Sequence, residues 1–240
     1  VMQERYLGDI HDFFKFIFLK FLSRNLEIKI GLNWYLVDPY KIGVDEVKKN
    51  DGEKRNFLSD STIRKYDENI AEEFDKFKNK ELRKINAFTQ NTHLKSYINF
   101  FNEFIDVNDR ENWVKRSLIH HKSESIIFLD PDNGFSFKNR GKSSLKYIFP
   151  GECKKYLSNN KVIIFTQFQS FRKNTLTHVN DILKNLNDCE LKTNISVVRN
   201  RTSPNTFFFT IKPSNSELNI EEILKKYVRK FPKTELISST

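Results

Sequence analysis

Two short apolar runs, each ending in polar residues, constrain the fold of this chain of 240 residues more than any other feature. One is Ser125 to Leu129 (SIIFL), followed by Asp130-Pro131-Asp132-Asn133-Gly134. The other is Lys161 to Phe165 (KVIIF), followed by Thr166-Gln167. A continuous apolar run of this length between turn residues is typical of a strand that is buried on both faces of a parallel sheet. The two runs therefore predict an α/β fold.

Helical and strand patterns alternate around these runs. Further strand patterns lie within 27–37, at 195–199 and at 206–211, and a turn between the last two predicts a C-terminal antiparallel strand pair. The polar segment 40–56 predicts a surface loop. Helical spacing covers residues 10–24, 59–79, 80–87, 95–104, 109–120, 175–186 and 220–231, with another helix expected after Pro150-Gly151. We expect one α/β domain over 1–240, with a helical insertion at about 57–120.

Glycine and cysteine usage excludes several classes of protein. The chain has seven glycines, and none of them form G-x-G-x-x-G or a P-loop, which excludes a P-loop nucleotidase and an ordinary NAD dehydrogenase. The two cysteines, Cys153 and Cys189, have no metal-ligand spacing, which excludes a zinc ribbon and a disulfide scaffold. The longest apolar stretch, 10–22, contains three charged residues and is shorter than the ~20 residues that span a bilayer. We therefore expect a cytoplasmic protein without a membrane partner.

The polar residues after the first run are the leading candidates for a functional site. Ligands of open α/β sheets bind beyond the carboxyl ends of the strands, where Asp130, Asp132 and Asn133 are expected. A carboxylate there can accept hydrogen bonds from an amino group, hold a divalent cation or act as a general base. The alternative is a simple turn, because each residue of Asp-Pro-Asp-Asn-Gly is a common turn former. Two carboxylates exceed what a turn requires, which favours a functional site.

Three landmarks occur in the order found in one enzyme family. They are Asp12-Phe13-Phe14-Lys15-Phe16, the strand with Trp34-Tyr35, and Phe128-Leu129-Asp130-Pro131. The chain thereby resembles the bacterial large-subunit rRNA adenine-N6 methyltransferases, which have an Asp-x-x-Lys-His motif, a first strand and an Asp-Pro-Pro-Tyr loop. The similarity spans about residues 8–170 and is confined to these landmarks.

The resemblance implies a Rossmann-like methyltransferase-type sheet and S-adenosylmethionine as cofactor. Asp130 would accept a hydrogen bond from the amine of a target adenine, and Pro131 would shape the loop. Asp132 and Asn133 take the positions of the family's second proline and its tyrosine. By the same resemblance, the cofactor would lie near Asp12, Lys15, Trp34, Tyr35 and Asp38.

The chain also departs from the family at two places. With Asn133 in place of tyrosine, a ring that stacks on the base would have to come from Phe135. The family's glycine-rich cofactor turn is replaced by Trp34 to Pro39, whose bulky side chains would crowd the methionine part of the cofactor. A second interpretation therefore stays open: a non-catalytic nucleic-acid-binding or defence-associated module on a degenerate methyltransferase scaffold.

An excess of basic residues indicates a polyanionic partner. Lys+Arg number 41 against 31 Asp+Glu, which gives a net charge of +10. Between 138 and 173 Glu152 is the one acid, and aromatic residues are interleaved with the cations, as on surfaces that bind DNA or RNA. The alternative is a solvated lysine-rich loop. The residues predicted to contact nucleic acid are Phe135, Lys138, Arg140, Lys142, Lys146 and Arg172.

A metal-dependent nuclease is a further alternative. Asp130 or Asp132 together with Glu152-Cys153-Lys154 has the acid and acid-x-lysine pattern of such sites, and a divalent metal is expected in this case alone. Pro150-Gly151 predicts a helix there, however, whereas this motif normally lies on a strand.

Overall fold

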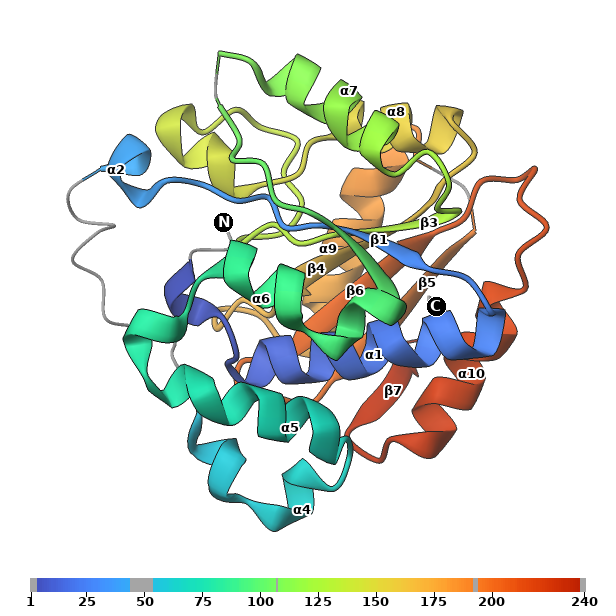
Figure 1. Ribbon diagram of the computed structural model, residues 1–240. Helices are drawn as coiled ribbons and strands as arrows, with labels where there is room; N and C mark the ends of the chain where they lie inside the picture. Colours follow the sequence, from blue (N-terminus) through green and yellow to red (C-terminus); the bar gives the residue numbers. More distant parts are fainter. Residues whose placement is uncertain (1–3, 44–53, 107, 192–193, 238–240) are drawn as a thin grey trace.

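The computed structural model describes residues 4–43, 54–106, 108–191 and 194–237. In the described residues a seven-stranded mixed sheet has the order β2-β1-β3-β4-β6-β5-β7 (Figure 1). The strands in chain order are β1 Ile30–Asn33, β2 Ile98–Phe101, β3 Ile126–Leu129, β4 Val162–Phe168, β5 Ile195–Asn200, β6 Thr206–Ile211 and β7 Thr234–Ile237.

The sheet has a parallel core and an antiparallel end. Strands β2, β1, β3 and β4 are parallel to one another, whereas β6 lies antiparallel between β4 and β5. The two apolar runs of the sequence form β3 and most of β4, and every residue of β3 is buried. The predicted α/β sheet with a C-terminal antiparallel pair is thereby confirmed. Strand β7, antiparallel to β5, is an addition that the sequence did not indicate.

Helices cover both faces of the sheet (Figure 1). Alternate residues of β3 show the two layers: Ile126 and Phe128 pack with α1, α5, α6 and α10, while Ile127 and Leu129 pack with α7, α8 and α9. The longer helices are α1 Ile10–Leu26, α5 Glu68–Asp75, α6 Ile85–Asn91, α7 Arg110–His120, α8 Pro150–Ser158, α9 Thr175–Asp188 and α10 Ile220–Lys230. Short helical turns are η1 Glu4–Tyr6, α2 Pro39–Ile42, η2 Asn56–Ser59, α4 Ser61–Arg64, η3 Lys76–Lys78, η4 Lys80–Leu82, η5 His93–Ser96 and η6 Gly141–Lys146.

Among the helices that the structure describes, α1 has the most buried residues, and its N-terminal end reaches the site. The side chain of Asp9 caps it by accepting hydrogen bonds from the backbone, and the helix ends where Glu27 takes a left-handed conformation with φ 55°. Phe18, in the middle of the helix, stacks on Phe208 of β6 at a centroid distance of 4.6 Å. The apolar residues that nearly encircle α1 thus pack against the sheet and against neighbouring helices, which leaves its polar first turn at the sheet edge.

The prediction of a helix over 95–104 is wrong, because that segment contains strand β2. Ile98 and Phe101 are three residues apart, a spacing that also occurs on one helix face. In β2 they point to opposite faces of the sheet, and both are buried because helices cover both faces. The segment 57–120 is therefore helical on either side of one sheet strand. Of the loop expected at 40–56, residues 44–53 lie outside the described residues.

Candidate functional site

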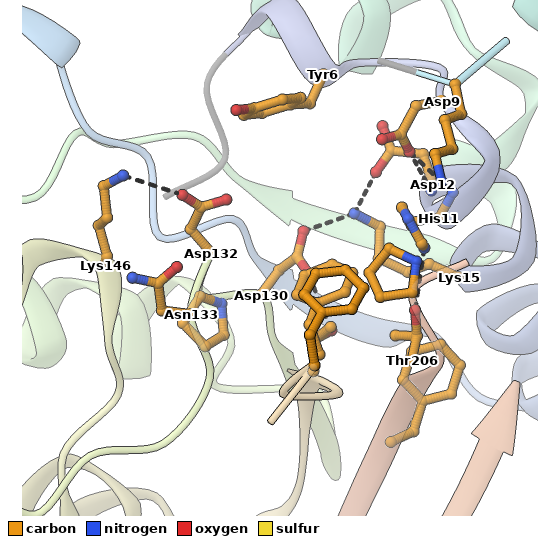
Figure 2. A pocket seen from close by; sticks show the side chains of 17 residues that line it. Tyr6, Asp9, His11, Asp12, Lys15, Asp130, Asp132, Asn133, Lys146 and Thr206 are labelled. Atoms are coloured by element: carbon orange, nitrogen blue, oxygen red, sulfur yellow. Dashed lines mark hydrogen bonds and ion pairs between the residues drawn. The ribbon is translucent and has the colours of Figure 1, made fainter. Parts of the chain in front are cut away.

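A pocket of about 380 Å³ opens at the carboxyl edge of the parallel strands (Figure 2). Three segments meet there: the loop after β3, the first turn of α1, and the end of β4 beside the start of β6. Because β6 runs antiparallel to β4, its first residue Thr206 pairs with the last residue of β4, Phe168. Residues from distant parts of the sequence thus line one cavity at the edge where the ligands of α/β sheets bind.

The backbone of the loop after β3 is fixed by hydrogen bonds. The amide of Asp130 donates to the Asn33 carbonyl at 3.0 Å, and the amide of Phe135 donates to Gln167 Oε1 at 3.0 Å. Gly134 has φ +80°, and a Cβ added there would lie 2.0 Å from that Gln167 oxygen. Glycine is required at this position, because other residues would be strained and would clash. The loop therefore holds its side chains in a defined place.

The ammonium of Lys15 lies between two carboxylates at the floor of the pocket. Its Nζ donates to Asp12 Oδ1 and to Asp130 Oδ2, both at 2.6 Å, and lies 4.6 Å from the centroid of the Trp34 ring. All three charged side chains are buried, with exposed fractions of 4% for Asp12, 4% for Lys15 and 8% for Asp130. Burial removes each charged group from water, which is unfavourable. The three charges can be buried at the floor of the pocket because they pair with one another.

Burial and pairing shift the pKa values of this group in definite directions. Burial raises the pKa of Asp12 to about 6, although the adjacent Lys15 opposes that shift. Burial would lower the pKa of Lys15, but the carboxylates of Asp12 and Asp130 outweigh this effect and raise it. Lys15 is consequently charged throughout the physiological range of pH.

Asp9 and His11 form a second polar wall of the pocket. Asp9 Oδ1 accepts hydrogen bonds from the amides of His11 and Asp12, each at 2.9 Å, and burial raises the pKa of Asp9 to about 6. His11 Nδ1 lies 3.0 Å from Thr206 Oγ1, and the imidazole contacts the Phe168 ring edge-on. Burial lowers the pKa of His11 to about 4, so its imidazole is neutral at pH 7.

Asp132 and Asn133 lie on the other side of Asp130. The Asp132 carboxylate forms an ion pair with Lys146 at 3.5 Å (Figure 2). The backbone amide of Asn133 donates to the Lys146 carbonyl at 2.9 Å. The four residues Asp130 to Asn133 that sequence reasoning placed in the site all line the pocket, and so does Lys146.

Four of the five cations predicted to contact nucleic acid lie outside the pocket lining. Lys138 extends over the Phe137 ring, and the Arg140 guanidinium lies 4.9 Å from the centroid of the Tyr147 ring. Lys142 and Arg172 are exposed. These cations belong to the loops that follow the site rather than to the cavity itself.

The remaining cations of the 138–173 segment are spread over other surfaces. Several of them form ion pairs away from the pocket: Lys154 with Glu190, Lys155 with Glu111, and Lys173 with Asp181. These three lysines of the basic segment are therefore paired with acids away from the pocket.

The aromatic rings at the pocket differ from those expected. Phe135 is 6% exposed and packs on Phe165, so it belongs to the core and does not face the cavity. Tyr6, Phe168 and Phe171 line the pocket instead, and Phe171 is 90% exposed. Sequence reasoning missed Phe171; the available signal was a phenylalanine within the polar loop after the second apolar run.

The residues expected to hold the cofactor separate into two groups. Asp12 and Lys15 line the pocket, whereas Trp34, Tyr35 and Asp38 do not. Trp34 and Tyr35 are fully buried on opposite faces of the sheet, against Phe100 and Trp113 respectively, and Asp38 caps the short helix α2. The space beyond β1, where the resemblance places the cofactor, is thus filled by side chains.

The acid-x-lysine pattern of a nuclease is not assembled at the pocket. Glu152 pairs with Arg110 at 2.5 Å and accepts a hydrogen bond from the Tyr35 hydroxyl, while Lys154 lies on the exposed face of α8. Among the described residues no group of three or more His, Cys, Asp or Glu side chains is arranged to hold a metal ion.

No protein-family model matches the sequence, and no curated protein matches it. None of the helices in the described parts of the chain has both the length and the apolar character needed to cross a membrane. The fold and the site together define an α/β protein with a polar, partly aromatic pocket at the carboxyl edge of its sheet.

Proposed function

We propose that this protein binds nucleic acid and receives one amine-bearing base in the pocket, with Asp130 as the acceptor for the exocyclic amine. The observation that carries the proposal is the fixed carboxylate of Asp130 at the floor of a pocket whose rim carries an exposed aromatic ring, Phe171. This is a deepened form of the role that the family resemblance implies for Asp130.

Asp130 retains capacity for a ligand although both of its oxygens have protein partners. Oδ2 accepts from Lys15, and Oδ1 accepts from the Thr166 hydroxyl at 3.1 Å. Each carboxylate oxygen offers about two acceptor sites, so each can accept one further hydrogen bond from a ligand amine. Since Asp130 is 8% exposed, the amine must enter the pocket to reach it, which favours an unstacked base over a base within a duplex.

Rings and cations around the pocket suit the rest of a nucleotide. Stacking of a base on an aromatic ring contributes about 1–3 kcal/mol, and Phe171 is accessible for such a contact. Lys54 lines the pocket, and Lys138, Arg140, Lys142 and Arg172 follow in the neighbouring loops, where they would contact phosphates outside it.

Fluorescence anisotropy with labelled single-stranded and duplex oligonucleotides tests this proposal. We expect the single strand to bind more tightly, and Phe171→Ala to weaken its binding by about 10-fold or more. Phe104→Ala is the matched control, because Phe104 is also an exposed phenylalanine, at 52%, but lines neither the pocket nor the loops that carry the cations. Equal losses in both variants, or no binding by the wild type, would refute the proposal.

Methyl transfer from S-adenosylmethionine to that amine is the second candidate function. It is favoured by the presence of Asp12 and Lys15, expected near the cofactor, in the same cavity as Asp130, since a methyl donor has to adjoin its acceptor. The filled space at Trp34 and Tyr35 means that the cofactor would have to enter this pocket. Calorimetric titration with S-adenosylmethionine distinguishes the two candidate functions. Binding of the cofactor that Asp12→Asn weakens would support a methyltransferase. Absence of binding at millimolar cofactor would leave a protein that binds nucleic acid without methylating it.

A further inference from the structure

The pocket has a second polar region that binding of a base at Asp130 does not use. Figure 2 shows Asp9, His11 and Thr206 on the side of Lys15 away from Asp132 and Lys146. Asp9 is the N-cap of α1, His11 lies in the first turn of that helix, and Thr206 is the first residue of β6. All three line the same cavity as Asp130, so one ligand can reach both regions.

One oxygen of Asp9 has no partner within the described residues. Oδ1 accepts both of the backbone hydrogen bonds that cap α1, whereas no described group donates to Oδ2. Asp9 is 5% exposed and lines the pocket, and its Oδ2 is not sealed from the cavity. A desolvated carboxylate oxygen without a donor is unfavourable, so this oxygen is a ready acceptor for a ligand group.

The imidazole of His11 offers a second unused atom. Its Nδ1 faces the Thr206 hydroxyl at 3.0 Å and the Thr202 hydroxyl at 3.5 Å, while Nε2 makes no hydrogen bond to any described residue. If Thr206 donates to Nδ1, then Nε2 carries the hydrogen and is a donor; in the other tautomer Nε2 is an acceptor. A ligand group that can both donate and accept fits either state.

The charges around this wall disfavour an ionic ligand group. The carboxylates of Asp12 and Asp130 and the ammonium groups of Lys54 and Lys15 all act electrostatically on His11, and Lys15 and Arg55 act on Asp9. Charges of both signs therefore surround the wall, and an ammonium group would meet the cations among them. An anionic group would meet the carboxylates of Asp9 and Asp12. A neutral hydroxyl avoids both repulsions. It can donate its one hydrogen to Asp9 Oδ2, and its oxygen can accept a hydrogen bond from His11 Nε2 in the tautomer in which Thr206 donates to Nδ1.

We infer that Asp9 and His11 form a subsite for sugar hydroxyls, and that the 2′-hydroxyl of the nucleotide whose base lies at Asp130 donates to Asp9 Oδ2. The inference rests on the proposed function and adds the sugar to it. The 2′-hydroxyl is the group by which a protein distinguishes a ribonucleotide from a deoxyribonucleotide at one site. The pocket would therefore select a ribonucleotide.

The test compares single-stranded oligonucleotides of one sequence that differ at a single nucleotide, which carries a 2′-hydroxyl, a 2′-hydrogen or a 2′-fluorine. The fluorinated sugar keeps the ribose pucker but cannot donate a hydrogen bond. We expect the wild type to bind the hydroxyl form about tenfold more tightly than either of the others, as one hydrogen bond to a charged group provides.

Asp9→Asn is the decisive variant, because asparagine is also a good helix cap and can keep α1 in place. Its Oδ1 can still accept the backbone amides, but Nδ2 then replaces the acceptor in the pocket. We expect the preference for the hydroxyl form to fall to about equal binding, with the affinity for the deoxy form unchanged. Asp60→Asn is the matched control, since Asp60 caps α4 by accepting from the Thr62 amide away from the pocket.

The possible outcomes separate the subsite from the proposed function. If the three oligonucleotides bind equally but Phe171→Ala still weakens binding, the hydroxyl subsite is overturned and the base pocket stands. If Asp9→Asn keeps the full preference for the hydroxyl form, the assignment to Asp9 is overturned. If the wild type binds none of them, both the subsite and the proposed function fall.

Discussion

The Lys15 ammonium lies 2.6 Å from the Asp130 carboxylate, although 115 residues separate them in the chain. This contact joins the second turn of α1 to the loop after β3 and fixes the floor of the pocket. It also brings two of the three sequence landmarks, the Asp12-to-Phe16 motif and the Asp130-Pro131 loop, into one site. The stability and the ligand binding of the protein should therefore depend on the same buried charges.

Replacement of Lys15 by methionine should destabilise the fold strongly. The substitution leaves the buried carboxylates of Asp12 and Asp130 without their cation, a loss that typically costs about 3–5 kcal/mol. Urea unfolding measures the change. Lys41→Met is the control, because Lys41 pairs with Asp106 at the exposed surface, where water screens the pair, and its loss should destabilise the fold far less than the loss of Lys15. Similar losses in the two variants would contradict the buried pairing.

The stability contributed by Asp9 should depend on pH. Burial raises the pKa of Asp9 from 3.8 to about 6, so the folded state holds this proton more tightly than the unfolded state does. The protonated Asp9 side chain therefore makes its full contribution to the stability of the fold below pH 4, and this contribution is lost as the pH rises through 6. We therefore expect the free energy of unfolding of the wild type to fall by up to roughly 3 kcal/mol, relative to that of Asp9→Asn, as the pH rises from 4 to 7.

Urea unfolding of both proteins at several pH values provides this comparison. His11, whose pKa is lowered to about 4, contributes the opposite slope, since its stabilising effect grows as the pH rises from 4 to 6.5. That slope is present in wild type and in Asp9→Asn, so it cancels in their difference. A difference that is constant with pH would show that Asp9 titrates normally.

Gly134→Ala should disturb the pocket through a clash as well as through backbone strain. The position has φ +80°, and an added Cβ would lie 2.0 Å from Gln167 Oε1, which holds the loop by accepting from the Phe135 amide. Gly141→Ala isolates the strain, because φ is +59° there and no atom lies within 4 Å of an added Cβ. We expect the free energy of unfolding to fall by about 1 kcal/mol in Gly141→Ala and by more in Gly134→Ala.

Oligonucleotide binding distinguishes the two glycine variants further. Only Gly134→Ala should weaken it, because only that substitution moves the loop carrying Asp130 and Asp132. Unchanged binding by Gly134→Ala would mean that the loop conformation is not required for the ligand.

Salt dependence of oligonucleotide affinity should identify the phosphate contacts. If Lys142 contacts a phosphate, Lys142→Ala should reduce the slope of log affinity against log salt by about 1. Lys225, exposed on α10, is a control that should leave the slope unchanged. Equal slopes for wild type and Lys142→Ala would place the nucleic acid elsewhere on the surface.

Local sequence patterns were enough to predict those elements whose burial shows in one segment. Ile126 to Leu129 and Val162 to Phe165 are apolar throughout, and buried strands require that, so β3 and the first part of β4 were predicted correctly. The same logic failed at Ile98 and Phe101, because burial on two faces of a strand produced the spacing of one helix face. A single segment cannot tell the two arrangements apart.

The sequence by itself determined the α/β class and the position of Asp130, Asp132 and Asn133 beyond a buried strand, since hydrophobic pattern and turn chemistry are local properties. Only the tertiary structure decided which side chains surround them. It placed Lys15, Asp9 and His11 beside Asp130, buried Phe135 in the core, and left Phe171 exposed at the rim. Those choices depend on how α1 and β6 pack across the sheet edge, and contacts between distant segments leave no periodic signal in either one.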